Sequence, residues 1–106
     1  MSENSYQQIT QEAAKEMMDM QEVVILDVRE QYEFDAGHIP GAVLLPVGTI
    51  TEDTAAALIE DSDTVVLVYC RSGNRSARAA AYLKGNGYAS VYDIGGIISY
   101  KGKIVK

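Results

Sequence analysis

Two long apolar runs dominate the pattern of hydrophobic and polar positions, at residues 23–28 and 65–69. Both are rich in β-branched residues and nearly continuous rather than alternating, which is typical of strands covered on both faces of a parallel sheet. Shorter apolar segments, one ending at Pro46 and one at a Gly-Gly pair, predict two further strands. The four predicted strands cover residues 23–29, 43–45, 64–69 and 90–94.

Apolar residues at helical spacing separate these strands. Thr10 can cap a first helix over residues 10–20, and Glu12 is favourable in its first turn. Residues 51–59 and 75–84 predict two more helices, and short helices or turns are expected at 31–36 and 97–100. Because strands alternate with helices, the predicted fold class is α/β with a mainly parallel sheet. The apolar stripe of the first helix is predicted to consist of Ile9, Ala13, Ala14, Met17 and Met20.

The composition limits the classes of protein that this chain can represent. Its 106 residues fit one domain, residues 1–106, with one core. The apolar fraction of 47% argues against disorder, and the net charge of -6 argues against general nucleic-acid binding. No run approaches the roughly 18 apolar residues that a membrane span needs, and the first residues lack a signal-peptide pattern. We therefore expect a cytoplasmic protein with no nucleic-acid or membrane partner.

Only one cysteine, Cys70, and one histidine, His38, occur in the sequence. A single cysteine excludes an internal disulfide framework and a multi-cysteine metal site, so we expect no metal and no cofactor. A free cysteine also suits a reducing compartment. In the Gly/Pro-rich segment 37–42, His38 is expected to fix a loop by hydrogen bonds rather than to act as a general base.

Cys70 lies where the second apolar run meets a polar loop and an alanine-rich helix. Parallel sheets open a ligand crevice at the carboxyl ends of their strands, and the helix N-terminus faces the same place. Backbone N–H groups of so short a loop can turn inward and hold an anion, and Gly73 supplies the conformational freedom. Arg71 is expected to attract an anion and favour the thiolate, and Arg75 to orient the loop or the anion. Cys70 is thus the predicted nucleophile, and the predicted binding residues are Arg71, Ser72, Gly73, Asn74, Arg75 and Ser76.

Cys70 also has a simpler interpretation as an inert core residue, because free cysteine is among the most buried residue types. The polar loop beside it is not a core context, so the functional interpretation is preferred. Asp27 and Arg29 end a strand close to the same edge of the sheet and are predicted as supporting residues. They can tune the charge of the loop or form an ion pair that holds the following turn, with Glu33 as a further partner. The ion pair is preferred.

Five short motifs occur in order along nearly the whole chain. They are Asp27-Val28-Arg29-Glu30 with Glu33-Phe34, Gly37-His38-Ile39-Pro40-Gly41-Ala42, Tyr69-Cys70-Arg71-Ser72-Gly73-Asn74-Arg75-Ser76, Gly87-Tyr88 with Val91-Tyr92, and Gly95-Gly96. Together they resemble the rhodanese family of sulfurtransferases in its small single-domain form. The resemblance implies a parallel sheet of about five strands flanked by helices on both faces. It also implies that Cys70 takes sulfur from a donor such as thiosulfate, carries it as a persulfide and passes it to cyanide or a thiol.

The length and charge of the cysteine loop narrow the chemistry that this resemblance implies. Four residues separate Cys70 from Arg75, whereas related phosphatases have one residue more to accommodate phosphate. Relatives that use mercaptopyruvate tend to have a neutral loop, so the two arginines favour thiosulfate or a similar anion. The expected partners are a small anionic sulfur donor and a thiol acceptor or sulfur-relay protein. Two alternative functions are compatible with the sequence. One is a sulfur-carrier or interaction module that a partner protein loads, and the other, less favoured, is a phosphatase or arsenate reductase.

Two features near the C-terminus are ambiguous in the sequence. Members of the family often have a tryptophan after the Gly-Gly pair, and Tyr100 stands near that place here, where it can line the pocket mouth or pack. The lysine-rich residues 101–106 are most simply interpreted as a solvated terminus.

Overall fold

The computed structural model describes residues 6–106 and contains a five-stranded sheet in which every strand pair is parallel. The strand order is β1-β5-β4-β2-β3, which places β4 at the centre. The predicted α/β class and parallel sheet are confirmed. The strands are β1 (Gln7–Gln8), β2 (Val24–Asp27), β3 (Val43–Leu44), β4 (Val65–Cys70) and β5 (Ser90–Gly96).

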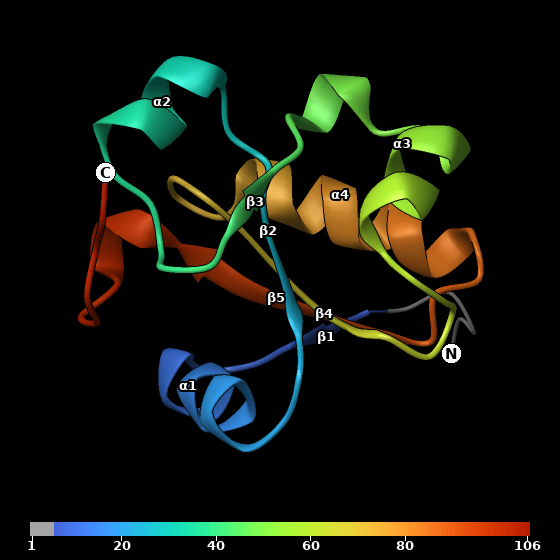
Figure 1. Cartoon of the computed structure of the whole chain (residues 1–106), viewed down its shortest axis with the longest axis horizontal. Coiled ribbons are helices and arrows are strands. Elements are labelled where there is room, and N and C mark those ends of the chain that lie inside the picture. Colours follow the sequence, from blue (N-terminus) through green and yellow to red (C-terminus); the bar gives the residue numbers. More distant parts are fainter. Residues whose placement is uncertain (1–5) are drawn as a thin grey trace.

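Helices cover both faces of the sheet, as expected (Figure 1). One face packs against α1, and the opposite face packs against α3 and α4. No helix among residues 6–106 is both long enough and apolar enough to cross a membrane. The helices are α1 (Gln11–Met20), α2 (Gln31–Ala36), α3 (Glu52–Leu58) and α4 (Asn74–Gly85), with short 3₁₀ turns η1 (Val47–Thr49) and η2 (Ile97–Ser99).

The central strand β4 sends alternate side chains into two separate cores. Val66, Val68 and Cys70 face the core under α3 and α4. Leu67 and Tyr69 face the core under α1. All five residues are at most 1% exposed, so burial on both faces explains why the apolar run in the sequence does not alternate.

The first helix begins and ends as predicted, but its last residue does not join the buried apolar stripe. Thr10 Oγ1 accepts the backbone N–H of Ala13 at 3.0 Å, and Ala14 is fully buried against the sheet. Met20 is 82% exposed, so its placement in the apolar stripe is wrong. It is the last residue of α1, where the chain turns away toward β2.

Two strand boundaries differ from the sequence pattern. The pattern of residues does not predict β1, because its two residues are exposed glutamines that pair with the edge of β5 through backbone alone. β5 extends to Gly96, two residues past the predicted end at 94. Gly95 has a φ of +88°, and the register between β4 and β5 shifts there, so the Gly-Gly pair forms a bulged continuation of the strand rather than a turn.

The C-terminal segment folds back onto the body of the protein. Val105 and His38 exchange two backbone hydrogen bonds, at 2.8 and 2.9 Å. The prediction of a solvated terminus is therefore wrong for Val105. It is confirmed for the lysine side chains of this segment, which are exposed. Tyr100 packs against the core under α1, which decides between the two interpretations in favour of packing.

Candidate functional site

Cys70 is the last residue of β4, and the chain that follows closes on its sulfur atom. The backbone N–H of Gly73 donates to Sγ at 3.0 Å, and Ser76 Oγ lies 3.5 Å from Sγ. Gly73 has a φ of +113° and precedes the first residue of α4, so a left-handed residue turns the chain from the loop into the helix. The structure thus brings together Cys70, Gly73 and Ser76 from the predicted set.

Two opposing effects act on the ionisation of Cys70. Burial of the thiol, in a residue that is 1% exposed, opposes its ionisation. Hydrogen bonds from the Ser76 side chain and from the backbone of Ser76, Gly73 and Ser72 outweigh burial and hold the pKa of Cys70 below its usual value. The backbone donors are those that the sequence predicted to turn inward, and Arg71 is not among the largest causes of the lowered pKa.

The Ser76 hydroxyl has two possible acceptors. Ser76 is completely buried, and its Oγ donates to the carbonyl oxygen of Gly73 at 3.0 Å. A hydroxyl carries a single proton, so Ser76 can donate either to Gly73 or to the sulfur of an ionised Cys70. Ionisation of the thiol is therefore coupled to rotation of this hydroxyl.

The outer side of the loop rests against the backbone that follows β5. The N–H of Ile98 donates to the carbonyl oxygen of Arg71 at 3.2 Å. Gly96 lies so close to the loop that a Cβ atom there would meet the Arg71 carbonyl and come within 2.7 Å of Ser72 Cα. In the sequence, the Gly-Gly pair marks the end of a predicted strand and belongs to a family motif, and its contact with the cysteine loop is visible only in the fold.

Three predicted binding residues form the exposed rim of the loop. Arg71, Ser72 and Asn74 are all exposed. The Arg71 side chain makes no ion pair with any residue in the range 6–106. Its guanidinium is therefore a cation at the rim, in a protein whose net charge is -6.

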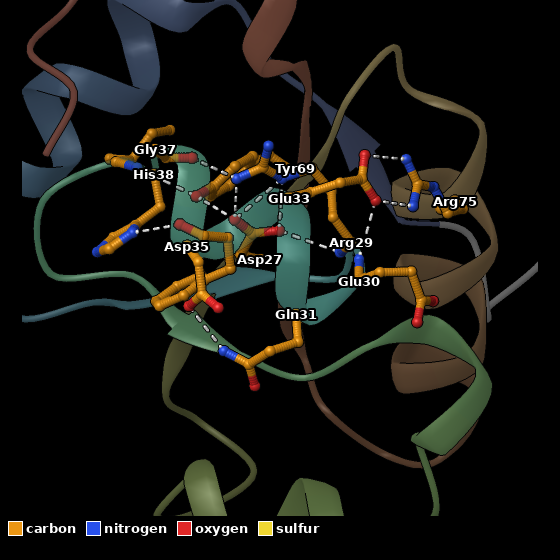
Figure 2. Close-up of polar contacts among 12 residues, drawn as sticks. Asp27, Arg29, Glu30, Gln31, Glu33, Asp35, Gly37, His38, Tyr69 and Arg75 are labelled. Carbon is orange, nitrogen blue, oxygen red and sulfur yellow. Dashed lines mark hydrogen bonds and ion pairs between the residues drawn. The ribbon is translucent and has the colours of Figure 1, made fainter. Parts of the chain in front are cut away.

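Arg75, which was predicted to orient the loop or the anion, forms an ion pair with a residue of α2 (Figure 2). Its Nη1 and Nη2 donate to the two carboxylate oxygens of Glu33, at 2.7 and 3.0 Å. The hydrogen bond from Arg75 is the largest cause that lowers the pKa of Glu33, to about 2, and the same contact raises the pKa of Arg75. Glu33 was considered as a partner of Asp27 and Arg29, and the structure instead makes it the partner of Arg75.

Asp27, Arg29 and Tyr69 form a buried polar cluster (Figure 2). Arg29 Nη2 donates to Asp27 Oδ2 at 2.6 Å and to the carbonyl oxygen of Gly37 at 2.7 Å. Tyr69 Oη donates to Asp27 Oδ2 at 2.7 Å and accepts the N–H of Ile39 at 3.1 Å. The cluster joins β4, one residue before the cysteine, to β2 and to the segment after α2, which agrees with the preferred interpretation as an ion pair that holds a turn.

His38 has the role expected of it. Its Nδ1 lies 2.9 Å from the carbonyl oxygen of Phe34, and its ring stacks on the Phe34 ring with 3.8 Å between centroids. These contacts fix the segment after α2. In the described part of the chain, no group of three His, Cys, Asp or Glu side chains is placed to hold a metal ion.

Known proteins resemble this chain over most of its length. The model of the rhodanese-like domain matches residues 10–103. A tRNA uridine(34) hydroxylase from Erwinia tasmaniensis is 39% identical over 88 residues, which cover 79% of this chain and 25% of that protein. The chain thus spans about a quarter of the length of the curated relatives it matches.

Solved structures share the fold as well as part of the sequence. A rhodanese-related protein from Thermoplasma volcanium superposes with a TM-score of 0.80 at 29% identity, over 94% of this chain and 98% of that one. A rhodanese from E. coli, solved with anions, superposes with a TM-score of 0.73 at 30% identity, over 80% of this chain and 99% of that one.

Proposed function

The chain belongs to the rhodanese-like domain family, and from that premise we propose that it is a sulfurtransferase that carries sulfane sulfur as a persulfide on Cys70. The supporting observation is the convergence of hydrogen-bond donors on Sγ, with the N–H of Gly73 at 3.0 Å. These donors stabilise the thiolate before transfer and are placed to stabilise the terminal sulfur anion of a persulfide after it.

In the first half-reaction, the Cys70 thiolate attacks the outer sulfur of the donor. A new S–S bond forms at Sγ, and the S–S bond of thiosulfate breaks. The electron pair of the broken bond leaves with sulfite. Cys70 then carries a terminal sulfur with one negative charge. The hydrogen bonds that lower the pKa of its thiol favour the thiolate that begins this step.

In the second half-reaction, an acceptor thiolate attacks the terminal sulfur of the persulfide. The Sγ–S bond breaks, its electron pair returns to Cys70 as thiolate, and the acceptor leaves as a persulfide. Cys70 is the only cysteine among these 106 residues, so the acceptor thiol lies outside this domain. Cyanide can replace the thiol in an assay and leaves as thiocyanate.

Thiosulfate, or another small anion with a sulfane sulfur, is the donor that we propose. The support is the Arg71 cation at the rim together with the helix N-terminus behind the loop. The related E. coli rhodanese was solved with anions.

Intact mass spectrometry after incubation with thiosulfate tests the proposed function. We expect the mass of the protein to increase by one sulfur atom, and cyanide or a thiol to remove it. The Cys70→Ser variant is the control and should gain no sulfur. A folded wild-type protein that gains no removable sulfur would contradict the proposal.

A sulfur-carrier module is the second candidate, because a carrier needs the same hydrogen-bond donors around a persulfide on Cys70 as an enzyme does. Stoichiometric loading by a cysteine desulfurase, combined with negligible turnover of thiosulfate, would support this candidate. Rapid turnover of thiosulfate would reject it.

A phosphatase or arsenate reductase is the least favoured candidate. The loop holds four residues between Cys70 and Arg75, and the fork of Arg75 is occupied by Glu33. Turnover of an aryl phosphate that is lost in Cys70→Ser would establish this candidate instead.

A further inference from the structure

We propose that Glu33 limits how tightly the cysteine loop binds a doubly charged anion, thiosulfate included, because its carboxylate occupies Arg75. The inference rests on the proposed function, since it concerns donor binding at the same loop. It assigns Glu33 as a specificity-determining residue and Arg75 as a group that the wild-type protein withholds from the anion.

The geometry of the ion pair removes one edge of Arg75 from the site. Both terminal nitrogens of its guanidinium donate to Glu33, one to each carboxylate oxygen. A tetrahedral oxyanion uses the same paired arrangement of N–H donors when arginine binds it. Arg75 therefore cannot offer this edge to an anion while the pair is intact.

The Glu33 carboxylate is also held in place by contacts that do not involve Arg75. Its Oε1 accepts the N–H of Glu30 at 3.0 Å, which closes the capping box of α2. The end of α2 is anchored in turn, because Arg29 donates to the carbonyl oxygen of Gly37. With a side chain that is 12% exposed, Glu33 is a preorganised partner rather than a mobile surface acid.

Charge balance then distinguishes one anion from another. The negative charge of Cys70 contributes to the raised pKa of Arg75, so the two groups lie within electrostatic range. Glu33 cancels the charge of Arg75, which leaves the neutral N–H donors of the loop and the rim cation Arg71. That set stabilises the single charge of a persulfide, and it binds a doubly charged donor more weakly than it would with Arg75 unpaired.

Sulfate is the probe for the test, because it is doubly charged and carries no transferable sulfur. Bound sulfate should protect Cys70 from alkylation by iodoacetamide, and protection measured at constant ionic strength gives its affinity. We expect Glu33→Gln to bind sulfate about tenfold more tightly than wild type, and the thiosulfate KM to fall in parallel. Glutamine retains an oxygen for the Glu30 N–H, so the capping box survives.

Asp35→Asn is the matched control. Asp35 lies on the same helix, carries the same charge, and contacts Gln31 rather than Arg75. Its loss should leave sulfate affinity unchanged. An equal gain in Asp35→Asn would mean that net charge alone is responsible, which would overturn the assignment of Glu33.

A double-mutant cycle shows whether Glu33 acts through Arg75. Arg75→Gln should weaken sulfate binding, because the carboxylate of Glu33 is then uncompensated beside the loop. Glu33→Gln combined with Arg75→Gln should return sulfate affinity to near the wild-type value.

The inference fails if Glu33→Gln binds sulfate no better than wild type, or if no variant shows protection. It also fails if both single variants and the double variant all bind sulfate more weakly, because the pair would then only hold the loop in place. A different result would reject the proposed function alone. In that case sulfate protects Cys70 better in Glu33→Gln than in wild type, but neither protein forms a persulfide with thiosulfate.

Discussion

The chemistry of the cysteine is set by a few atoms around Sγ. Burial opposes the thiolate, and hydrogen bonds from Ser76 and from the loop backbone favour it more strongly. An acidified thiol surrounded by neutral dipoles can become a persulfide without a general base nearby. Ser76 is the only side chain among these donors, which makes its contribution accessible to mutation.

Ser76→Ala should raise the pKa of Cys70 toward the ordinary value for a cysteine, because the thiolate loses a donor. The rate of persulfide formation at neutral pH should fall roughly fivefold to tenfold, the effect of losing one hydrogen bond to a charged group. The rate of alkylation by iodoacetamide as a function of pH measures the pKa directly. Ser62→Ala, an exposed residue before β4, is the control, and an unchanged profile in Ser76→Ala would contradict this role.

At the scale of elements, the site lies where three segments meet at the carboxyl ends of β4, β2 and β5. The cysteine loop leaves β4, α2 follows β2, and the Gly-Gly bulge ends β5. Figure 1 shows α2 and η2 at the same end of the molecule. The shape of the loop therefore depends on backbone packing between elements as well as on its own residues.

Gly96→Ala should impair the loop more than the fold. An added Cβ meets the backbone of Arg71 and Ser72, so the loop or β5 has to move. We expect a loss of stability of about 1 to 3 kcal/mol and a decrease in persulfide loading of more than tenfold. Denaturant unfolding and intact mass separate the two effects.

Gly48→Ala is the control for this substitution, because a Cβ at Gly48 meets no atom within 4 Å. Its stability and sulfur loading should match wild type. Normal loading in Gly96→Ala would show that the loop tolerates displacement and would contradict the prediction.

Asp27→Asn should destabilise the whole protein, because it leaves the buried guanidinium of Arg29 without a charged partner. Both side chains are at most 6% exposed, and breaking a buried pair on one side costs about 3 to 5 kcal/mol. The free energy of unfolding in urea measures the loss. The exposed Asp63→Asn is the control, and a loss below about 1 kcal/mol in Asp27→Asn would show that the cluster is dispensable.

At the scale of the whole molecule, the Glu33–Arg75 pair links stability to pH. The pKa of Glu33 is about 2 in the folded protein, below its ordinary value of 4.5. A depressed pKa means that the folded state holds the ionised form more strongly than the unfolded chain does. The stabilisation is therefore complete above about pH 4.5 and is lost as the pH falls toward 2.

Glu33→Gln should be less stable than wild type at pH 7, by about 1 to 2 kcal/mol once screening of a partly exposed pair is allowed for. The difference should shrink between pH 4.5 and 2, because the wild-type carboxylate becomes protonated in that range. Urea unfolding at a series of pH values measures this difference, with Asp35→Asn as the control. A difference that stays constant with pH would contradict the assigned pKa.

Several features could be predicted because they depend on residues that are neighbours in the sequence. The continuous apolar run of β4, the Thr10 cap and the cysteine at a strand end before a helix all follow from local pattern. The number of residues between Cys70 and Arg75 is likewise a property of the sequence. Together with the order of the motifs, these features were enough to predict the fold class and to select Cys70.

The tertiary structure decided which groups meet across the sheet. Arg75 pairs with Glu33, and Tyr69 with Asp27, although 42 positions separate the members of each pair. Gly96 contacts the cysteine loop only because β5 pairs with β4. No local pattern encodes such contacts, since they depend on strand order and on how the chain returns to the same edge of the sheet. For that reason the sequence by itself could select Cys70 as the candidate nucleophile, and only the fold showed that Arg75 pairs with the Glu33 carboxylate.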